Sequence, residues 1–155
     1  MIRGRFAIDD LTSRPAPTTA LAERTREWLL EMQRCVRARD FDCGRALFAD
    51  DVFSFGTRAP VAGSAAELER EQWREVWTRT AGFTFEVERA RAIVEGRLSC
   101  IALPWRSLGL PGEVAFERRG RATLVLAVRD DGDDREGDLV CVHSHFSIEP
   151  EPGGS

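Results

Sequence analysis

The spacing of apolar residues predicts a helical first half of the chain. Over residues 20–36, apolar side chains recur every three or four positions and charged residues fill the other positions, which indicates an amphipathic helix. Residues 40–42 predict the start of a short second helix, with Asp42 as its N-cap and residues 46–48 packed back on the first helix. Residues 52–56 then predict a strand with aromatic side chains on one face.

A third helix and a run of strands follow. Ser64 and Glu67 form a capping box, which predicts that a helix starts there, and Gly82 is expected to end it. Beyond Gly82, apolar and polar residues alternate, which is the period of two typical of strands. Strands are predicted over residues 83–94, 98–105, 114–129 and 139–148, with turns between them. Helices followed by such a run indicate an α+β fold, in which helices on one face of a strongly curved antiparallel sheet form a cone around a pocket.

Composition narrows the class of protein. A chain of 155 residues predicts one domain, over residues 20–149, with an N-terminal arm (1–19) and a flexible tail (150–155). The net charge of −4 argues against nucleic acid or an anionic membrane as a partner. No apolar run approaches the ~20 residues of a membrane span, and residues 1–19 lack the apolar core of a signal peptide, so the cytoplasm is expected. Every basic residue is arginine, and Lys, Tyr and Asn are absent. We interpret this as codon bias in a GC-rich, bacterial genome.

The cysteines and histidines suggest no metal or cofactor. The four cysteines contain no Cys-x-x-Cys pair, and we expect free, mostly buried thiols. Cys141, His143 and His145 alternate and could present three zinc ligands on one strand face. Nothing elsewhere in the sequence supports a zinc site, so neither a metal nor a cofactor is predicted.

Several motifs add to this order of elements, in residues 120–126, 142–147, 39–42 and 47–52, and in Trp73 and Trp77. Together with the order of elements, they resemble the SnoaL-like members of the nuclear-transport-factor-2-like (NTF2-like) superfamily. The last strand, with its His-x-His-x-Ser pattern, is also similar to the association domain of calcium/calmodulin-dependent kinase II. The resemblance covers residues 20–150. It implies an NTF2-like cone, the fold of ketosteroid isomerase-like proteins, with a hydrophobic cavity, a small hydrophobic ligand, no cofactor and a homodimer.

The resemblance is weaker for activity, because this fold hosts isomerases, cyclases, dehydratases, binding modules and oligomerisation domains. Ketosteroid isomerase-like members polarise a carbonyl with tyrosine, and scytalone dehydratase-like chemistry also depends on tyrosine. The present chain contains no Tyr. Arginines and histidines are the polar groups that its last two strands offer instead.

The face of strand 139–148 that looks into the cone decides between two interpretations. Alternation places Cys141, His143 and His145 on one face and Ser144 and Phe146 on the other. A register error of one residue exchanges the two faces, and the sequence leaves this choice open.

If the histidine face points inward, His145 or His143 could act as a general base. A carboxylate such as Asp40 would orient the imidazole, and Arg121 would hold an anionic substrate or an oxyanion. If the other face points inward, the pocket is apolar and the histidines lie on the convex side. The pocket residues predicted in that case are Phe53, Phe55, Trp73, Trp77, Trp105, Leu124, Ser144 and Phe146.

Two functions fit the sequence. The first is a small-molecule-binding protein with an apolar-aromatic cavity, which could also be a cofactor-independent isomerase, cyclase or hydrolyase acting on a hydrophobic metabolite. The alternative is a non-catalytic dimerisation or ligand-sensing module, in which the histidines only organise an interface. The sequence does not decide whether the protein is an enzyme.

Overall fold

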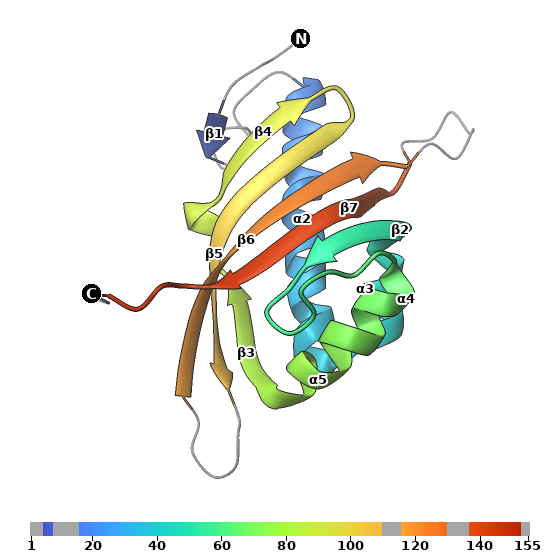
Figure 1. Ribbon diagram of the computed structural model, residues 1–155. Helices are drawn as coiled ribbons and strands as arrows, with labels where there is room; N and C mark the ends of the chain where they lie inside the picture. The colour runs from blue at the N-terminus through green and yellow to red at the C-terminus, as the bar shows by residue number, and fades with distance from the viewer. Residues whose placement is uncertain (1–4, 8–15, 110–115, 130–136, 153–155) are drawn as a thin grey trace.

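One curved sheet organises the molecule. The computed structural model describes residues 5–7, 16–109, 116–129 and 137–152, and it confirms the α+β architecture (Figure 1). The strands are β1 (Arg5–Ala7), β2 (Phe48–Phe55), β3 (Thr80–Phe85), β4 (Arg91–Glu95), β5 (Leu98–Gly109), β6 (Phe116–Val128) and β7 (Leu139–Ile148). Their order is β1-β4-β5-β6-β7-β2, and β3 pairs with the half of β5 that β4 leaves free. All pairs are antiparallel except β2 with β7, and β1 lies in a segment for which the sequence predicted no element.

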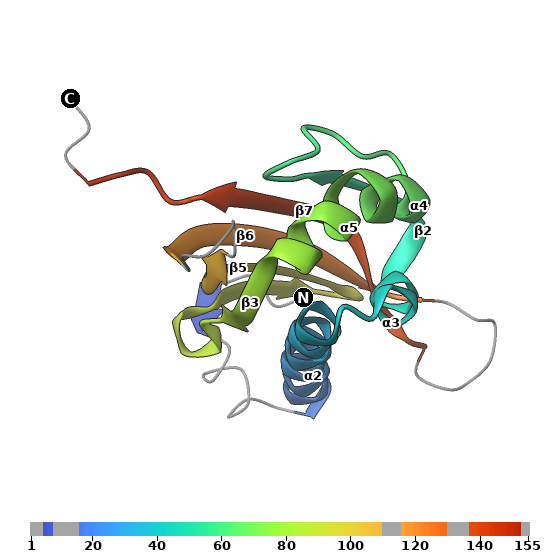
Figure 2. The same cartoon turned by 90° about the horizontal axis from the view of Figure 1, so that it is seen from below.

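The helices pack on one side of this sheet. The long helix α2 (Ala16–Ala38) runs along the sheet, and α3 (Phe41–Ala46) follows it. A second helical segment consists of α4 (Ala65–Leu68), a π-helical turn (Glu69–Trp73), α5 (Arg74–Val76) and a 3-10 turn (Trp77–Arg79). In Figures 1 and 2, α3, α4 and α5 gather next to β2, at one end of α2. No helix in the described part of the chain combines the length and apolar character of a membrane span.

The turn between α2 and α3 differs from the prediction at its cap. The N-cap of α3 is Asp40 and not Asp42, because the Asp40 side chain accepts a hydrogen bond from the Cys43 backbone N–H at 3.0 Å. Arg39 takes a left-handed conformation with φ of 55°, which ends α2. The Asp40 N–H then donates to the Cys35 carbonyl at 2.9 Å, and the Arg39 N–H donates to the Val36 carbonyl at 3.2 Å. These two bonds form a Schellman motif, so backbone and side chain both fix this turn.

The start of the third helix is confirmed, and its end is not. The Ser64 hydroxyl accepts a hydrogen bond from the Glu67 N–H at 3.1 Å, as the capping box predicts. The helix ends at Arg79, before Gly82, because β3 already begins at Thr80. Gly82 lies inside β3 with φ of 62°, a conformation that glycine adopts at low cost.

Two predicted strand boundaries were also wrong. Residues 46–48 do not all continue the second helix, because the Leu47 carbonyl accepts a hydrogen bond from the Cys141 N–H and β2 begins at Phe48. The strand predicted over residues 83–94 is interrupted by a 3-10 turn (Val87–Arg89). This turn separates β3 from β4, and each of these two strands pairs with a different half of β5. Just before the turn, the Glu86 N–H donates a hydrogen bond to the Pro104 carbonyl of β5 at 3.0 Å.

A bulge in β7 changes which of its residues share a face. The pairing of β6 with β7 shifts between Val125, which lies opposite His143, and Leu126, which lies opposite Cys141. Val142 is therefore the extra residue. Cys141 is fully buried in the hydrophobic core, while the neighbouring histidines lie on the outer face. The prediction that Cys141 shares a face with them was wrong, which also removes the three-ligand zinc arrangement.

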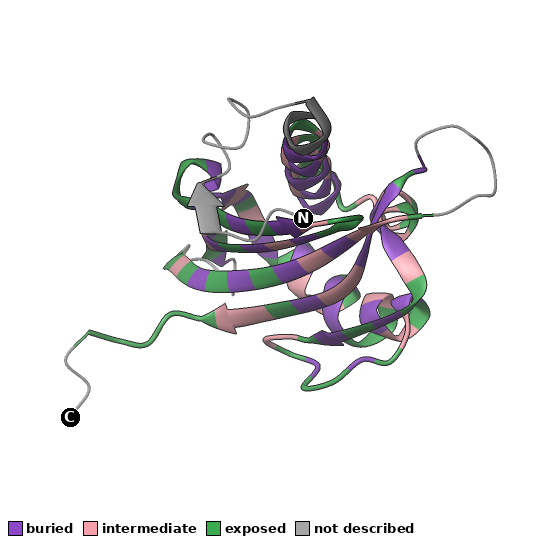
Figure 3. Cartoon of the chain, turned by 90° about the horizontal axis from the view of Figure 1, so that it is seen from above, coloured by how far each residue is buried: buried purple, intermediate pink, exposed green. Residues whose placement is uncertain are grey.

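Buried and exposed residues alternate along the sheet. Figure 3 shows this as alternating bands on β6, where Gly120, Ala122, Leu124 and Leu126 are buried and the residues between them are less so. The buried residues face the helices and form one continuous core with the apolar side of α2. The exposed residues of β6 therefore belong to the convex side of the cone.

Gly120 makes room for the indole of Trp105, the residue opposite it on β5. A Cβ atom at this position would overlap the Trp105 ring and the Ser147 carbonyl. The ring of Trp105 thus lies directly on the β6 backbone, which only glycine permits.

We expect Gly120→Ala to lower the free energy of unfolding by about 1–3 kcal/mol or more, because the backbone carbonyl of Ser147 cannot move away from the added methyl group. Chemical denaturation measures the change. Gly63→Ala is the matched control, because its added Cβ would meet only the end of the Glu67 side chain at 3.5 Å. Equal stability of the two variants would contradict the packing described here.

Candidate functional site

A pocket is enclosed by three parts of the structure: α2, the second helical segment (residues 65–79) and the inner face of the sheet. Met32 and Val36 line it from α2, and Leu68, Gln72, Trp73, Val76 and Trp77 line it from the second helical segment. The sheet contributes Thr80, Phe83, Trp105, Ser107, Arg118, Ser144 and Phe146. The space open to the centre of a water molecule is about 60 Å³. That volume exceeds what a single water needs.

The helical wall of the pocket is a stack of aromatic rings. The rings of Trp73 and Trp77 stack with centroids 4.6 Å apart, and the Phe41 ring also stacks on Trp77, at 5.3 Å. Gly44 allows this stack to approach α3, because a Cβ there would lie 2.7 Å from the Trp77 ring. The π-helical turn that ends at Trp73 lies in this wall, and such turns frequently occur at functional sites.

The sheet side of the pocket has a polar end. Among the described residues, the Trp105 Nε1 and Ser107 Oγ atoms are buried and have no hydrogen-bond partner. Ser107 pairs across the sheet with Arg118, and the Arg118 guanidinium carbon lies 6.0 Å from the Trp105 ring centroid. Burial lowers the pKa of this guanidinium. Buried polar atoms without a partner are rare, so these two groups are an unusual feature among the residues that line the pocket.

Ser144 faces the pocket from β7, and its hydroxyl also holds β2. The Ser144 and Ser54 Oγ atoms lie 2.8 Å apart. Both residues are buried, with 2% and 1% of their surface exposed. Each hydroxyl is the buried partner of the other.

We expect Ser144→Ala to reduce the free energy of unfolding by about 1–3 kcal/mol, because it leaves the buried Ser54 hydroxyl without its partner. The double variant Ser54→Ala/Ser144→Ala should cost less than the sum of the two single variants. Urea unfolding of the four proteins measures this coupling. Strict additivity would show that the hydroxyl pair does not stabilise the contact between β2 and β7.

The structure places most of the predicted pocket residues in this site. Trp73, Trp77, Trp105, Ser144 and Phe146 line the pocket. Phe55 also borders it, although its ring lies with that of Phe53 against the two histidines on the convex side. Phe53 and Leu124 do not line the pocket. Phe53 points to the convex side, where it is 52% exposed, because it lies beside His143 of the neighbouring strand β7 on the outer face of the sheet. Leu124 is fully buried in the hydrophobic core.

The candidate catalytic residues lie outside the pocket. The Nδ1 atom of His143 lies 2.9 Å from the Phe53 carbonyl, and its ring contacts the Phe53 ring at 4.3 Å. His145 contacts the Phe55 ring at 5.5 Å and, with Arg121, lines a shallow hollow on the convex face. Asp40 caps α3 and does not line either cavity. Their catalytic roles stay a prediction, and the pocket is lined by the opposite face of β7.

Sequence reasoning did not assign Ser107 or Arg118 to the pocket. The available signal was strand parity, because Ser107 follows Trp105 by two residues and Arg118 precedes the inward-facing Gly120 by two. Parity places Arg119 and Arg121 on the outer face, with the histidines. The sequence prediction placed Arg121 with the histidines but could not say whether that group faces inward.

Comparison with known proteins agrees with this fold. The profile of the SnoaL-like domain matches residues 26–150, and the chain belongs to this family. No curated protein matches the sequence. An NTF2-like superfamily protein from Salmonella enterica serovar Typhimurium is similar in structure, with a TM-score of 0.75 and 13% identity over 89% of this chain and 97% of that one.

Two other solved structures carry functional descriptions. One, from Erwinia carotovora atroseptica, is described as a ketosteroid isomerase-like protein and matches with a TM-score of 0.67 and 12% identity, over 81% of this chain and 94% of that one. The other, from Xanthomonas campestris, is described as a candidate calcium/calmodulin-dependent protein kinase II association domain. It matches with a TM-score of 0.61 and 14% identity, over 88% and 90% of the two chains. At these identities the likeness shows the fold alone, which hosts unrelated functions.

Proposed function

We propose that this SnoaL-like protein binds a small aromatic or apolar molecule that ends in a carboxylate or carbonyl oxygen. The aromatic wall of Trp73 and Trp77 would hold the apolar part. The observation that carries the proposal is the polar end, where the Trp105 N–H and the Ser107 hydroxyl are buried without a partner beside Arg118. All three groups can donate hydrogen bonds, so they complement an acceptor oxygen.

The size of the cavity limits the ligand. With about 60 Å³ open to the centre of a water molecule, the pocket fits a compound of about one aromatic ring rather than a large polycyclic metabolite. Benzoate combines one ring with one carboxylate and is therefore a suitable probe. Benzyl alcohol has a similar ring without the negative charge.

We expect benzoate to bind the wild-type protein, and Arg118→Gln to weaken this binding about 10- to 100-fold, because a hydrogen bond to a charged group contributes about 1.5–3 kcal/mol. Isothermal titration calorimetry measures both affinities. Arg119→Gln is the matched control, since Arg119 lies on the outer face and pairs with Glu117 at 2.9 Å. Benzyl alcohol should be much less sensitive to Arg118→Gln. Failure of benzoate to bind, or equal losses in both arginine variants, would refute the proposal.

This proposal concerns binding. The enzymatic alternative, with His145 or His143 as the base and Arg121 as the anion stabiliser, would need the outer hollow as its site. His145→Ala should leave benzoate affinity unchanged, because the imidazole lies on the other side of β7 from the pocket.

We also propose that the convex face of the sheet mediates a homodimer. Phe53 and Phe55 are 52% and 39% exposed there and pack against the two imidazoles. Adjacent exposed aromatic side chains of this kind frequently mark a protein interface. The similar structure described as an association domain supports self-association of this fold.

We expect the wild-type chain to be dimeric and Phe53→Glu to be monomeric in light scattering coupled to size-exclusion chromatography, because the new charge would be desolvated at the interface. Val61→Glu is the control, since Val61 is 63% exposed in the segment between β2 and α4. A wild-type protein with the mass of one chain would contradict this second proposal and leave the ligand proposal intact.

A further inference from the structure

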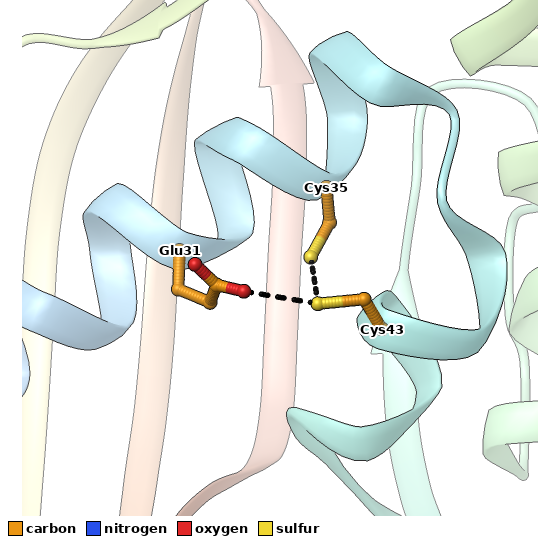
Figure 4. A group of neighbouring side chains, drawn as sticks. All are labelled: Glu31, Cys35 and Cys43. Atoms are coloured by element: carbon orange, nitrogen blue, oxygen red, sulfur yellow. Dashed lines mark hydrogen bonds between the residues drawn. The ribbon is translucent and has the colours of Figure 1, made fainter.

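Two cysteine side chains are in contact at the turn between α2 and α3. The Cys35 and Cys43 Sγ atoms lie 2.6 Å apart, and Figure 4 shows both side chains pointing toward one another from the two helices. Cys35 is fully buried, while Cys43 is partly exposed. The sulfurs are thus already in contact, and solvent reaches this pair through Cys43.

The turn holds these sulfurs together. The Cys35 carbonyl accepts the hydrogen bond of the Schellman motif from Asp40, and the Asp40 side chain accepts one from the Cys43 N–H. One residue therefore binds the backbone of both cysteines. Because backbone hydrogen bonds anchor each end of the turn, the approach of the two thiols requires no rearrangement of the helices.

Charged groups surround the exposed thiol. The Arg34 Nη2 atom lies 3.0 Å from the Cys43 Sγ atom, and the Glu31 Oε1 atom lies 3.1 Å from it. Arg34 also binds both carboxylate oxygens of Glu31, which lowers the pKa of Glu31 to about 2. Burial raises the pKa of both cysteines, and the Glu31 carboxylate raises that of Cys43 further while Arg34 lowers it.

We propose that Cys35 and Cys43 form a redox-modification site that a hydroperoxide oxidises to an intramolecular disulfide. The Cys43 thiolate attacks the peroxide oxygen and becomes a sulfenic acid, releasing water or an alcohol. The Cys35 sulfur then attacks the Cys43 sulfur, a second water leaves, and the S–S bond forms. Overall, two thiols lose two electrons and two protons to one hydroperoxide, and a dithiol reductant reverses the oxidation by thiol–disulfide exchange.

A disulfide explains this cluster better than a bound metal ion does. Glu31, Cys35 and Cys43 could offer three ligand atoms within 4.8 Å of one another. However, Arg34 occupies the Glu31 carboxylate, and Asp40 is engaged with the Cys43 N–H. A structural zinc site takes four protein ligands and needs both thiols deprotonated. The raised pKa values oppose that requirement, whereas oxidation needs only one thiolate at a time.

The disulfide would join two elements that support the pocket wall. Cys35 lies between the pocket residues Met32 and Val36 on α2. Cys43 precedes Gly44, which packs on Trp77. Closing this short loop should raise the Tm of the oxidised protein by about 5–10 °C, because the cross-link reduces the entropy of the unfolded chain.

Treatment of the wild-type protein with hydrogen peroxide, followed by intact mass spectrometry and thiol labelling, tests the proposal. We expect a mass decrease of two hydrogen atoms, a fall from four free thiols to two, and a peptide that links Cys35 to Cys43. Dithiothreitol should reverse all three changes. Cys43→Ser should not form the link, whereas the control Cys100→Ser should form it.

Four free thiols after treatment, a different cysteine linkage, or a Cys43 sulfinic acid without a link would overturn the proposal. Stoichiometric zinc binding that protects both thiols and is lost in Glu31→Gln would overturn it in favour of a metal site.

The rate of oxidation gives a test that does not depend on removing a cysteine. Glu31→Gln should accelerate disulfide formation near neutral pH, because it removes the negative charge that disfavours the Cys43 thiolate. Arg34→Gln should slow it, because it removes the neighbouring positive charge. Effects of equal sign in the two variants would contradict the assignment of Cys43 as the reacting thiol.

Discussion

The pairing register of β6 with β7 is the constraint on which the pocket depends. Hydrogen bonds place His145 opposite Thr123 and Phe146 opposite Ala122, so one side of β7 must face the helices and the other must face outward. Ala122 and Leu124 are buried, which fixes Ser144 and Phe146 on the inner side and both histidines on the outer side. The extra residue, Val142, returns Cys141 to the core without moving the histidines inward.

The same parity determines the chemistry of the pocket. Side chains alternate between the two faces of β5 and β6, so Trp105, Ser107 and Arg118 face inward. The same alternation places Arg119 and Arg121 on the convex side. Because Gly120 has no side chain, the Trp105 indole can lie against the β6 backbone, where it lines the cavity. An aromatic wall therefore faces a group of hydrogen-bond donors, which is an arrangement suited to an apolar molecule with one acceptor end. The convex face is a separate surface. It carries Arg119, Arg121 and the two histidines, together with the exposed rings of Phe53 and Phe55.

The sequence predicted the succession of elements well because hydrophobic periodicity carries that information. The bounds of β7 agree with the predicted strand 139–148, and the capping hydroxyl of Ser64 is where the sequence indicates. The aromatic residues Trp73, Trp77 and Trp105 were also predicted, since large apolar side chains at regular spacing must face the interior.

Long-range relationships were harder to predict. A bulge such as that at Val142 has no reliable sequence signal, so Cys141 was placed on the wrong face. Arg118 was not assigned to the pocket, because the inward face of β6 depends on its partner strands. Cys35 and Cys43 lack the Cys-x-x-Cys spacing and meet only because Arg39 and Asp40 fold the chain back.

The most direct measurement is an NMR titration with benzoate that reads both sides of β7 at once. The protein has four tryptophans and two histidines, so both sets of side-chain signals can be assigned with single substitutions. The account predicts that the indole N–H signal of Trp105, which has no protein acceptor, shifts on binding. The corresponding signal of Trp28, bonded to the Leu47 carbonyl at 3.1 Å, and both imidazole signals should stay in place. Shifts of the imidazole signals with an unchanged Trp105 signal would contradict the account and place the ligand on the convex face.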